Sequence, residues 1–170
     1  MKKFHAGALF IIFFMTALTC IAQKSKAQKQ FVGTWRLVSI VDLDPNLPYR
    51  ELNPTGLIIY DGTGHMAVQI TRRSDRAMFA SEEEAKATAE EKTAAFGSYA
   101  AYYGTYTIDE KAGTITHHVE GSLFPNNVGK DLVRRFKLSG DQVTLMPLGT
   151  NNSGPPNSAP QRSLTWEKVK

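Results

Sequence analysis

The sequence of 170 residues contains a single cysteine, Cys20, which lies within the first 22 residues. A chain that loses this segment has no thiol, which excludes disulfide bonds, cysteine-ligated zinc and a cysteine nucleophile. Its stability must then come from a hydrophobic core. The roughly 145 residues that remain are enough for one domain that buries about two-thirds of its unfolded surface.

The sequence also lacks a large excess of charge of one sign. It has 20 Lys and Arg against 16 Asp and Glu, and Lys2 and Lys3 in the N-terminal segment account for half of the net charge of +4. The other basic residues are scattered and form neither a stripe nor a basic arm. We therefore expect no nucleic-acid partner.

Several catalytic and cofactor-binding motifs are absent as well. There is no glycine-rich phosphate loop, no Gly-x-Ser-x-Gly elbow, no His-Glu-x-x-His pair and no EF-hand loop. The sequence therefore predicts no nucleotide, flavin or other cofactor.

The one long apolar run lies at the N-terminus. The residues GALFIIFFMTALTCIA, Gly7 to Ala22, follow a short basic start. This arrangement predicts a secretory signal peptide over residues 1–22, with cleavage after Ala22 or as late as Ala27. The run is shorter than the roughly 20 residues that a membrane span needs, so we expect no transmembrane span after its removal. The mature protein is then periplasmic or secreted, with a lipoprotein acylated on Cys20 as the alternative.

After a polar linker over residues 23–30, the chain from 31 to 170 predicts one all-β domain. Three hairpins, which turn at 61–64, 109–113 and 139–141, lie between an opening strand from Gly33 to Leu43 and a closing strand from Arg162 to Val169. Tight turns between eight strands are typical of an antiparallel up-and-down barrel or a sandwich. Alternation along the opening strand predicts that Trp35, Leu37 and Val41 share one face.

One segment between the third and fourth strands breaks this pattern. The residues SEEEAKATAEEKTAAF, Ser81 to Phe96, predict a helix with Ser81 as N-cap and Glu84 in a capping box. The helix either lies on the surface between the two strands or forms a lid over one mouth of a barrel. A long Gly-, Pro-, Ser- and Asn-rich loop, Asn151 to Pro160, precedes the closing strand.

The stretch THHVEGSLFP contains two adjacent histidines in a predicted strand. His117 and His118 face opposite sides of a regular strand, so they cannot chelate one metal ion, and we expect no metal site. If His118 and Glu120 face inward, the carboxylate orients the imidazole for acid–base chemistry. If Ile115 and Val119 face inward, His117 is the lumen histidine instead. The pattern leaves both alternatives open, so His117, His118 and Glu120 are all candidate catalytic residues.

The same parity places Arg134 on the inward face of its strand. A buried arginine needs a carboxylate partner from the protein or from a ligand, so Arg134 is expected to hold an acidic head group beside aromatic contacts. The candidate ligand-binding residues are Trp35, Tyr60, Met66, Gln69, Tyr106, His117, His118, Glu120, Arg134 and Phe136.

The block VGTWRLVS resembles the Gly-x-Trp opening of lipocalins. Together with NPTGLIIYDGTGHMAVQI, YYGTYTIDEKAGTITHHVEGSLFPN, DLVRRFKLSGDQVTL and LTWEKV, it makes the chain from Phe31 to Val169 similar to the lipocalin-like domain family of the calycin group. The resemblance implies an eight-stranded calycin-type barrel whose Trp plugs the closed end. Arg162 is the expected counterpart of the arginine that caps this Trp in lipocalins.

The resemblance also implies a pocket for a small, mostly hydrophobic molecule. Related barrels include carriers and cofactor-free cyclases, so the fold does not fix the activity. The first hypothesis is therefore an exported binding protein for a lipophilic or amphipathic molecule. The alternatives are a cofactor-free isomerase or cyclase that uses a lumen His or Glu, and a module that binds other proteins.

Overall fold

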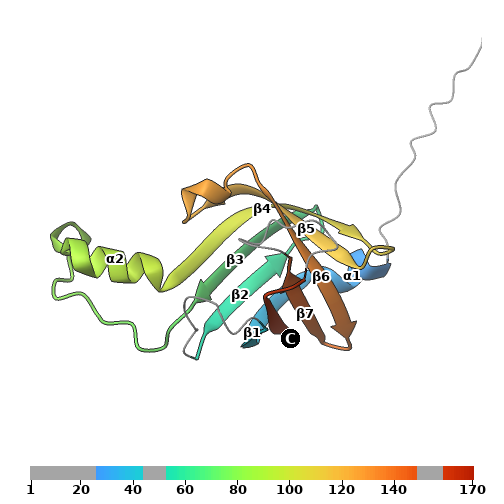
Figure 1. Ribbon diagram of the computed structural model, residues 1–170, viewed down its shortest axis with the longest axis horizontal. Coiled ribbons are helices and arrows are strands. Elements are labelled where there is room, and N and C mark those ends of the chain that lie inside the picture. Colours follow the sequence, from blue (N-terminus) through green and yellow to red (C-terminus); the bar gives the residue numbers. More distant parts are fainter. Residues whose placement is uncertain (1–25, 44–52, 149–158) are drawn as a thin grey trace, which may run out of the picture.

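The computed structural model describes residues 26–43, 53–148 and 159–170. The predicted signal peptide, Cys20 and most of the loop from 151 to 160 lie outside the described residues. Eight antiparallel strands close into a barrel in chain order (Figure 1). Their bounds are β1 (Gly33–Asp42), β2 (Thr55–Tyr60), β3 (His65–Thr71), β4 (Tyr99–Asp109), β5 (Thr114–Ser122), β6 (Asp131–Ser139), β7 (Gln142–Pro147) and β8 (Arg162–Lys168).

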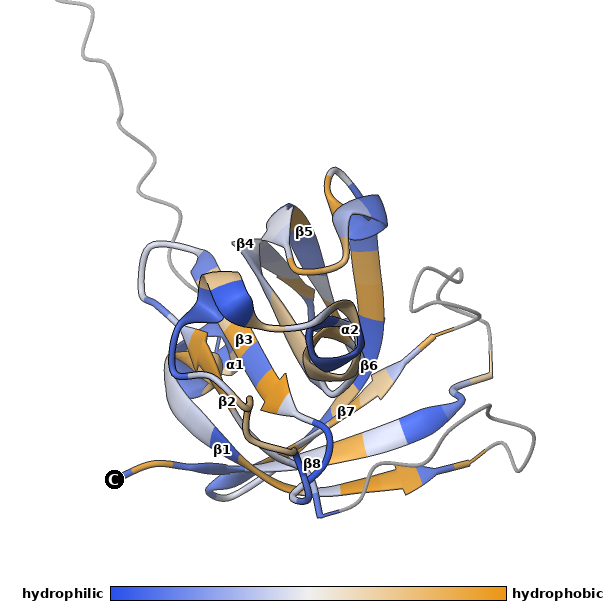
Figure 2. Cartoon of the chain, turned by 90° about the vertical axis from the view of Figure 1, so that its left-hand side faces the viewer, coloured by the Kyte–Doolittle hydropathy of each residue, from blue (hydrophilic) through white to orange (hydrophobic). Residues whose placement is uncertain are grey.

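The barrel closes because β8 pairs with both β7 and β1. The predicted up-and-down barrel is thus confirmed. Hydrophobic and hydrophilic residues both occur along the strands (Figure 2). Buried and more exposed residues alternate along most of the strands, because successive side chains point into and out of the barrel. On β2, for example, Ile58 and Tyr60 are buried, whereas Leu57 and Ile59 are more than two-fifths exposed.

The first strand departs from simple alternation. Its register against β8 shifts between Leu37 and Ser39, so one extra residue is inserted into β1. Such a bulge reverses the parity of the residues that follow it. Ile40 therefore packs against the core, while Val41 is 52% exposed. The prediction that Val41 shares the inner face with Trp35 is wrong for this reason.

A short helix, α1 (Lys26–Phe31), seals one end of the barrel. The Phe31 ring is fully buried and makes edge-to-face contacts with Tyr60 and Phe136, at centroid distances of 5.3 and 5.1 Å. The indole Nε1 of Trp35 donates a hydrogen bond to the Phe31 carbonyl at 2.7 Å. The prediction of a linker over residues 23–30 is thus wrong from Lys26 onward, because these residues form a helix that ends in a core residue.

The cation over Trp35 is a lysine. Lys168 Nζ lies 5.1 Å from the centre of the Trp35 ring and donates a hydrogen bond to the Gln30 carbonyl at 3.0 Å. Arg162, the expected capping arginine, is at the far end of β8 and pairs with Asp42 at 3.1 Å. The expectation for Arg162 is wrong because β8 brings its last residue, rather than its first, beside Trp35.

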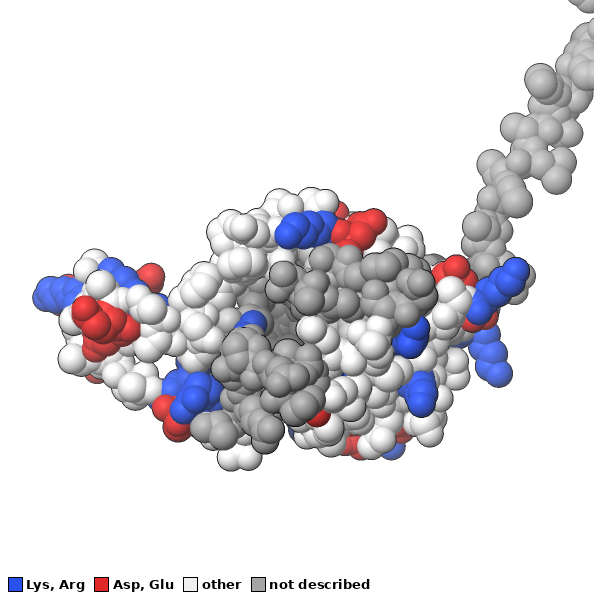
Figure 3. Space-filling view, viewed as in Figure 1, with Lys and Arg blue, Asp and Glu red and all other residues white. Residues whose placement is uncertain are grey.

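The chain between β3 and β4 forms an arm that contains η1 (Glu84–Lys86) and α2 (Ala89–Gly97). The arm extends from the start of β4, at the opposite end of the molecule from α1 (Figure 1), and carries charged side chains of both signs (Figure 3). None of the residues of α2 is buried. A second short helix, η2 (Pro125–Asn127), lies between β5 and β6.

The start of α2 differs from the prediction. Thr88 is the N-cap and forms a capping box with Glu91, whose carboxylate accepts from the Thr88 amide. Ser81 instead accepts a hydrogen bond from the amide of Glu83, in a local turn before η1. The predicted N-cap Ser81 is wrong because the Thr88–Glu91 pair offers the same capping pattern later in the segment.

In the described part of the chain, the helices are too short or too polar to cross a bilayer.

Candidate functional site

His117 lies at the centre of a polar cluster inside the barrel. β5 turns its side chain inward, where it is fully buried beside Tyr106 of β4 and Leu132 of β6. The Tyr60 hydroxyl lies 2.8 Å from Nε2, and the Tyr102 hydroxyl lies 2.9 Å from Nδ1. Both ring nitrogens of His117 are therefore engaged by tyrosines from different strands.

Arg134 on β6 extends this cluster and is only 6% exposed. Its Nη2 donates to the Tyr102 hydroxyl at 2.9 Å, and its Nη1 donates to the Leu132 carbonyl at 2.7 Å. The guanidinium carbon also lies 5.8 Å from the centre of the Tyr102 ring. Among residues 26–43, 53–148 and 159–170, no carboxylate forms an ion pair with Arg134.

Burial keeps the cluster around Arg134 uncharged. Desolvation lowers the pKa of His117 well below its ordinary value, and the charge of Arg134 lowers it further. Burial also raises the pKa of Tyr60 and of Tyr102. At neutral pH, Arg134 is then the charged member of the group. Within the described ranges, no three His, Asp or Glu side chains gather as metal ligands.

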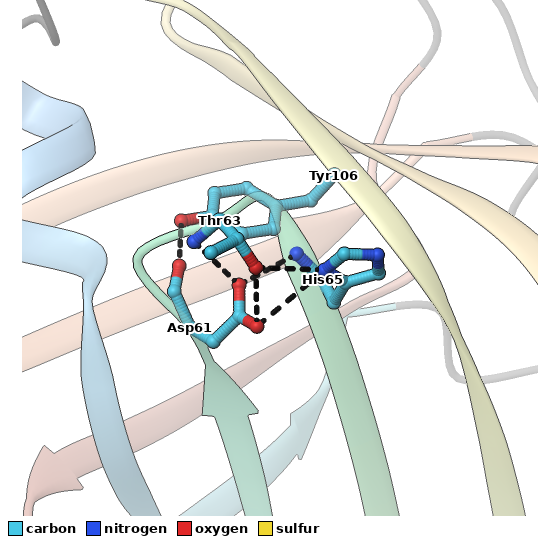
Figure 4. Close-up of polar contacts among 4 residues, drawn as sticks. All are labelled: Asp61, Thr63, His65 and Tyr106. Atoms are coloured by element: carbon cyan, nitrogen blue, oxygen red, sulfur yellow. Dashed lines mark hydrogen bonds and ion pairs between the residues drawn. The ribbon is translucent and has the colours of Figure 1, made fainter.

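The β2–β3 turn closes the cluster on the side of α1. The Tyr106 hydroxyl donates to the Asp61 carbonyl at 2.9 Å, and the Tyr106 ring lies edge-on to Tyr60 at 4.9 Å. The Asp61 carboxylate accepts from the amides of Thr63 and His65, both at 2.8 Å (Figure 4). The hydrogen bond from the Thr63 hydroxyl contributes most to holding the pKa of Asp61 well below its usual range. The turn thus holds Tyr106 in place beside Tyr60, whereas His65 is exposed on the outside of the barrel.

A cavity of about 510 Å³ lies at the other end of the barrel, where the arm begins. Tyr102 and Leu132 contribute to its wall from inside the barrel. Phe96, Leu123 and Phe124 also line it, and each of these side chains is between 38% and 52% exposed. Tyr102 therefore belongs both to the buried cluster and to the wall of the cavity.

Seven of the ten predicted ligand-binding residues point into the barrel. These are Trp35, Tyr60, Met66, Tyr106, His117, Arg134 and Phe136. Trp35 lies under α1 at the sealed end, so it is remote from the cavity. The structure brings Tyr60, His117 and Arg134 together in one hydrogen-bonded cluster.

The other three predicted residues, Gln69, His118 and Glu120, lie on the outer face of the barrel. Gln69 accepts from the Tyr99 hydroxyl at 2.8 Å, and His118 Nδ1 lies 2.6 Å from the Asp131 carboxylate. Glu120 is exposed at a register shift between β4 and β5. Of the two alternatives for β5, the one in which Ile115 and Val119 face inward and bring His117 with them is correct. Gln69 points outward because it alternates with the inward residues of β3.

Tyr102 is the main residue of the cluster that is not among the ten predicted ligand-binding residues. It shares an inward face of β4 with Tyr106, so strand parity provides the signal that finds it. Arg72, Phe96 and Phe124 also line the cavity and lie outside the strands. No periodicity in the sequence marks them as neighbours of Tyr102.

A comparison with protein families agrees with this geometry. The sequence model of a lipocalin-like domain family matches residues 32–169, which include all eight strands. The chain belongs to this lipocalin-like family. A search of curated proteins found no match to the chain. Membership of the lipocalin-like family supports the binding of a ligand in general and leaves its identity to the cavity and the cluster.

Proposed function

We propose that this lipocalin-like protein is an exported carrier that binds a small, mostly hydrophobic molecule at the open end of its barrel. The cavity beside Tyr102 is the observation that carries this proposal. Its volume of about 510 Å³ falls in the range of small-molecule sites. Apolar and aromatic side chains line it together with a few polar residues, which is the usual composition of such sites.

The geometry favours binding over acid–base catalysis. A catalytic histidine must reach the proton that it transfers, directly or through one water molecule. His117 is fully buried, and both of its ring nitrogens are occupied by tyrosine hydroxyls. The other histidine of the pair, His118, lies outside the barrel next to Asp131. A cofactor-free isomerase or cyclase is therefore less well supported than a carrier.

Export is the second part of the proposal, and α1 supports removal of the signal peptide after Ala22. The Ala27 side chain is buried, and its amide donates to a Glu110 carboxylate oxygen at 2.7 Å. Cleavage after Ala27 would remove this amide and the first two residues of α1. Cleavage after Ala22 leaves the whole helix in a periplasmic or secreted protein.

The test of the carrier is binding of the neutral fluorophore N-phenylnaphthylamine to the purified mature chain. We expect a saturable rise in fluorescence, because the dye leaves water for an apolar cavity. Ala100 lines this cavity on the same face of β4 as Tyr102. The substitution Ala100→Trp should fill the cavity and weaken binding at least about tenfold.

Val38→Trp is the matched control, because it adds the same ring to a half-exposed position on the outside of the barrel. The control should bind the dye as the unmodified chain does. Equal binding by the Ala100→Trp and Val38→Trp chains would place the dye elsewhere and overturn the proposed site.

A further inference from the structure

We infer that the ligand of this cavity carries an acidic head group, held as an anion by the Tyr102 hydroxyl and the Arg134 guanidinium. The inference rests on the proposed function and specifies the chemical class of its ligand. It follows from the directions of the hydrogen bonds in the buried cluster.

The direction of the hydrogen bond between Tyr60 and His117 follows from the burial of Tyr60. Its side chain is almost fully buried, and its hydroxyl has one hydrogen-bond partner among the described residues, His117 Nε2. A buried hydroxyl whose hydrogen has no acceptor is destabilising. The Tyr60 hydroxyl therefore donates to Nε2. A neutral imidazole has one donor and one acceptor nitrogen, so Nδ1 of His117 carries the hydrogen.

The directions of the hydrogen bonds at Tyr102 follow from this tautomer of His117. The Nδ1 hydrogen of His117 is donated to the Tyr102 oxygen, 2.9 Å away, and Arg134 Nη2 donates to the same oxygen. Two donated hydrogens use both lone pairs of a hydroxyl oxygen. The hydrogen of Tyr102 itself is then left to donate to another group, and Tyr102 is the residue of the cluster that lines the cavity.

The charge of Arg134 determines what kind of acceptor fits. A buried guanidinium without a carboxylate is strongly unfavourable, and none of the described carboxylates pairs with it. An atom hydrogen-bonded to the Tyr102 hydroxyl lies within about 6 Å of this guanidinium, a range at which opposite charges attract appreciably. A carboxylate supplies both the acceptor and the negative charge. Arg72 also lines the cavity.

The experiment compares an acid with its ester on the same hydrocarbon chain. Dodecanoate and methyl dodecanoate are titrated at pH 8 against bound N-phenylnaphthylamine in the mature protein. We expect dodecanoate to displace the dye at a concentration at least about tenfold lower than the ester. Tyr102→Phe should reduce this preference several-fold and leave the affinity for the ester nearly unchanged. Arg134→Met should abolish the preference.

Tyr103→Phe is the matched control, because the adjacent ring lies on the outer face and is 58% exposed. It should keep the full preference for the acid. Equal displacement by acid and ester in the unmodified chain would overturn the inference while the carrier stands. The inference is overturned in the same way if Tyr102→Phe, folded as judged by circular dichroism, keeps the preference. Failure of the dye and of both dodecyl compounds to bind would overturn the carrier itself.

Discussion

The imidazole of His117 is surrounded inside the barrel by the hydroxyls of Tyr60 and Tyr102 and by the charge of Arg134. The absence of solvent around the ring and, after it, the charge of Arg134 oppose a second proton, which lowers the pKa of His117 below the ordinary value of 6.5. Once the chain unfolds, the ring is hydrated and takes up that proton readily. The folded state therefore loses stability relative to the unfolded state when the solution becomes acidic.

The sign of this linkage gives a prediction for pH. At and above about pH 7, His117 is neutral in both states and its contribution is fully present. Below the unfolded-state pKa, near 6.5, the unfolded chain binds one more proton than the folded chain. The free energy of unfolding should then fall by up to about 1.4 kcal/mol per pH unit. Urea unfolding between pH 5.5 and 8 measures this slope.

Two variants separate His117 from the rest of the protein in this measurement. His117→Asn should lower stability at pH 8 but flatten the slope below pH 6.5. His118→Gln, which removes the histidine on the outer face, should keep the slope that His117 causes. Tyr60, Tyr102 and Arg134, which face His117, do not change charge in this pH range. A slope that persists in folded His117→Asn would contradict the assignment.

Strand parity predicts individual residues well only where the strand is regular. It places Arg134 and Tyr106 inside the barrel correctly. For the adjacent histidines it leaves two alternatives, with either His117 or His118 facing the lumen. It cannot place Met66 and Gln69 on one face, because residues three apart on a regular strand point in opposite directions. The contacts of Tyr60 and Tyr102 with His117 join three strands, and no local pattern in the sequence contains them.

The close pairing of β4 with β5 requires a glycine at position 104. Its register shifts after Tyr103, where Glu120 is the extra residue on β5. At Gly104 the strands approach so closely that an added Cβ would lie 1.9 Å from the His118 carbonyl oxygen. Only a residue without a Cβ fits between the two strands at this point.

Gly104→Ala should therefore destabilise the barrel. Its methyl group meets backbone, which cannot move aside as a flexible side chain can, so we expect a loss of at least about 2 kcal/mol. Gly97→Ala is the control, because nothing lies within 4 Å of its Cβ and the residue ends α2. The control should be neutral or gain a few tenths of a kcal/mol. Equal melting temperatures for the two variants would contradict the role of Gly104.

Elements with local signals are predictable from the sequence, and those that depend on tertiary contacts are not. The three hairpin turns are correct because glycine and aspartate mark each of them directly. The helix α1 is not predictable in this way, because its six residues are mostly polar and only Ala27 and Phe31 are buried. The bulge in β1 has no sequence marker either, and it reverses the parity of Val41.

The barrel and the arm form two parts of unequal stability. The barrel contains the aromatic core around Phe31, Trp35 and Tyr60, and its strands are hydrogen-bonded on both sides. In the arm, α2 buries none of its side chains, and Met78 is 91% exposed. A segment with few buried apolar contacts opens locally with little free energy.

Hydrogen exchange should therefore divide the molecule at this boundary. Amides of α2 are expected to exchange orders of magnitude faster than those of β5 and β6, although both sets are hydrogen-bonded in regular structure. Mass spectrometry of peptides after exchange measures the difference, with the strand amides as the internal reference. Comparable protection of α2 and β5 would contradict the division and show that the arm is as stable as the barrel.

The contact between Lys168 and Gln30 has a practical consequence for handling the molecule. It joins the last strand to α1 at the sealed base, and the carboxyl terminus follows directly at Lys170. A sensor chip that captures the chain through a tag after Lys170 would attach it at this end of the barrel. The cavity beside Tyr102, at the other end of the barrel, would then point away from the chip.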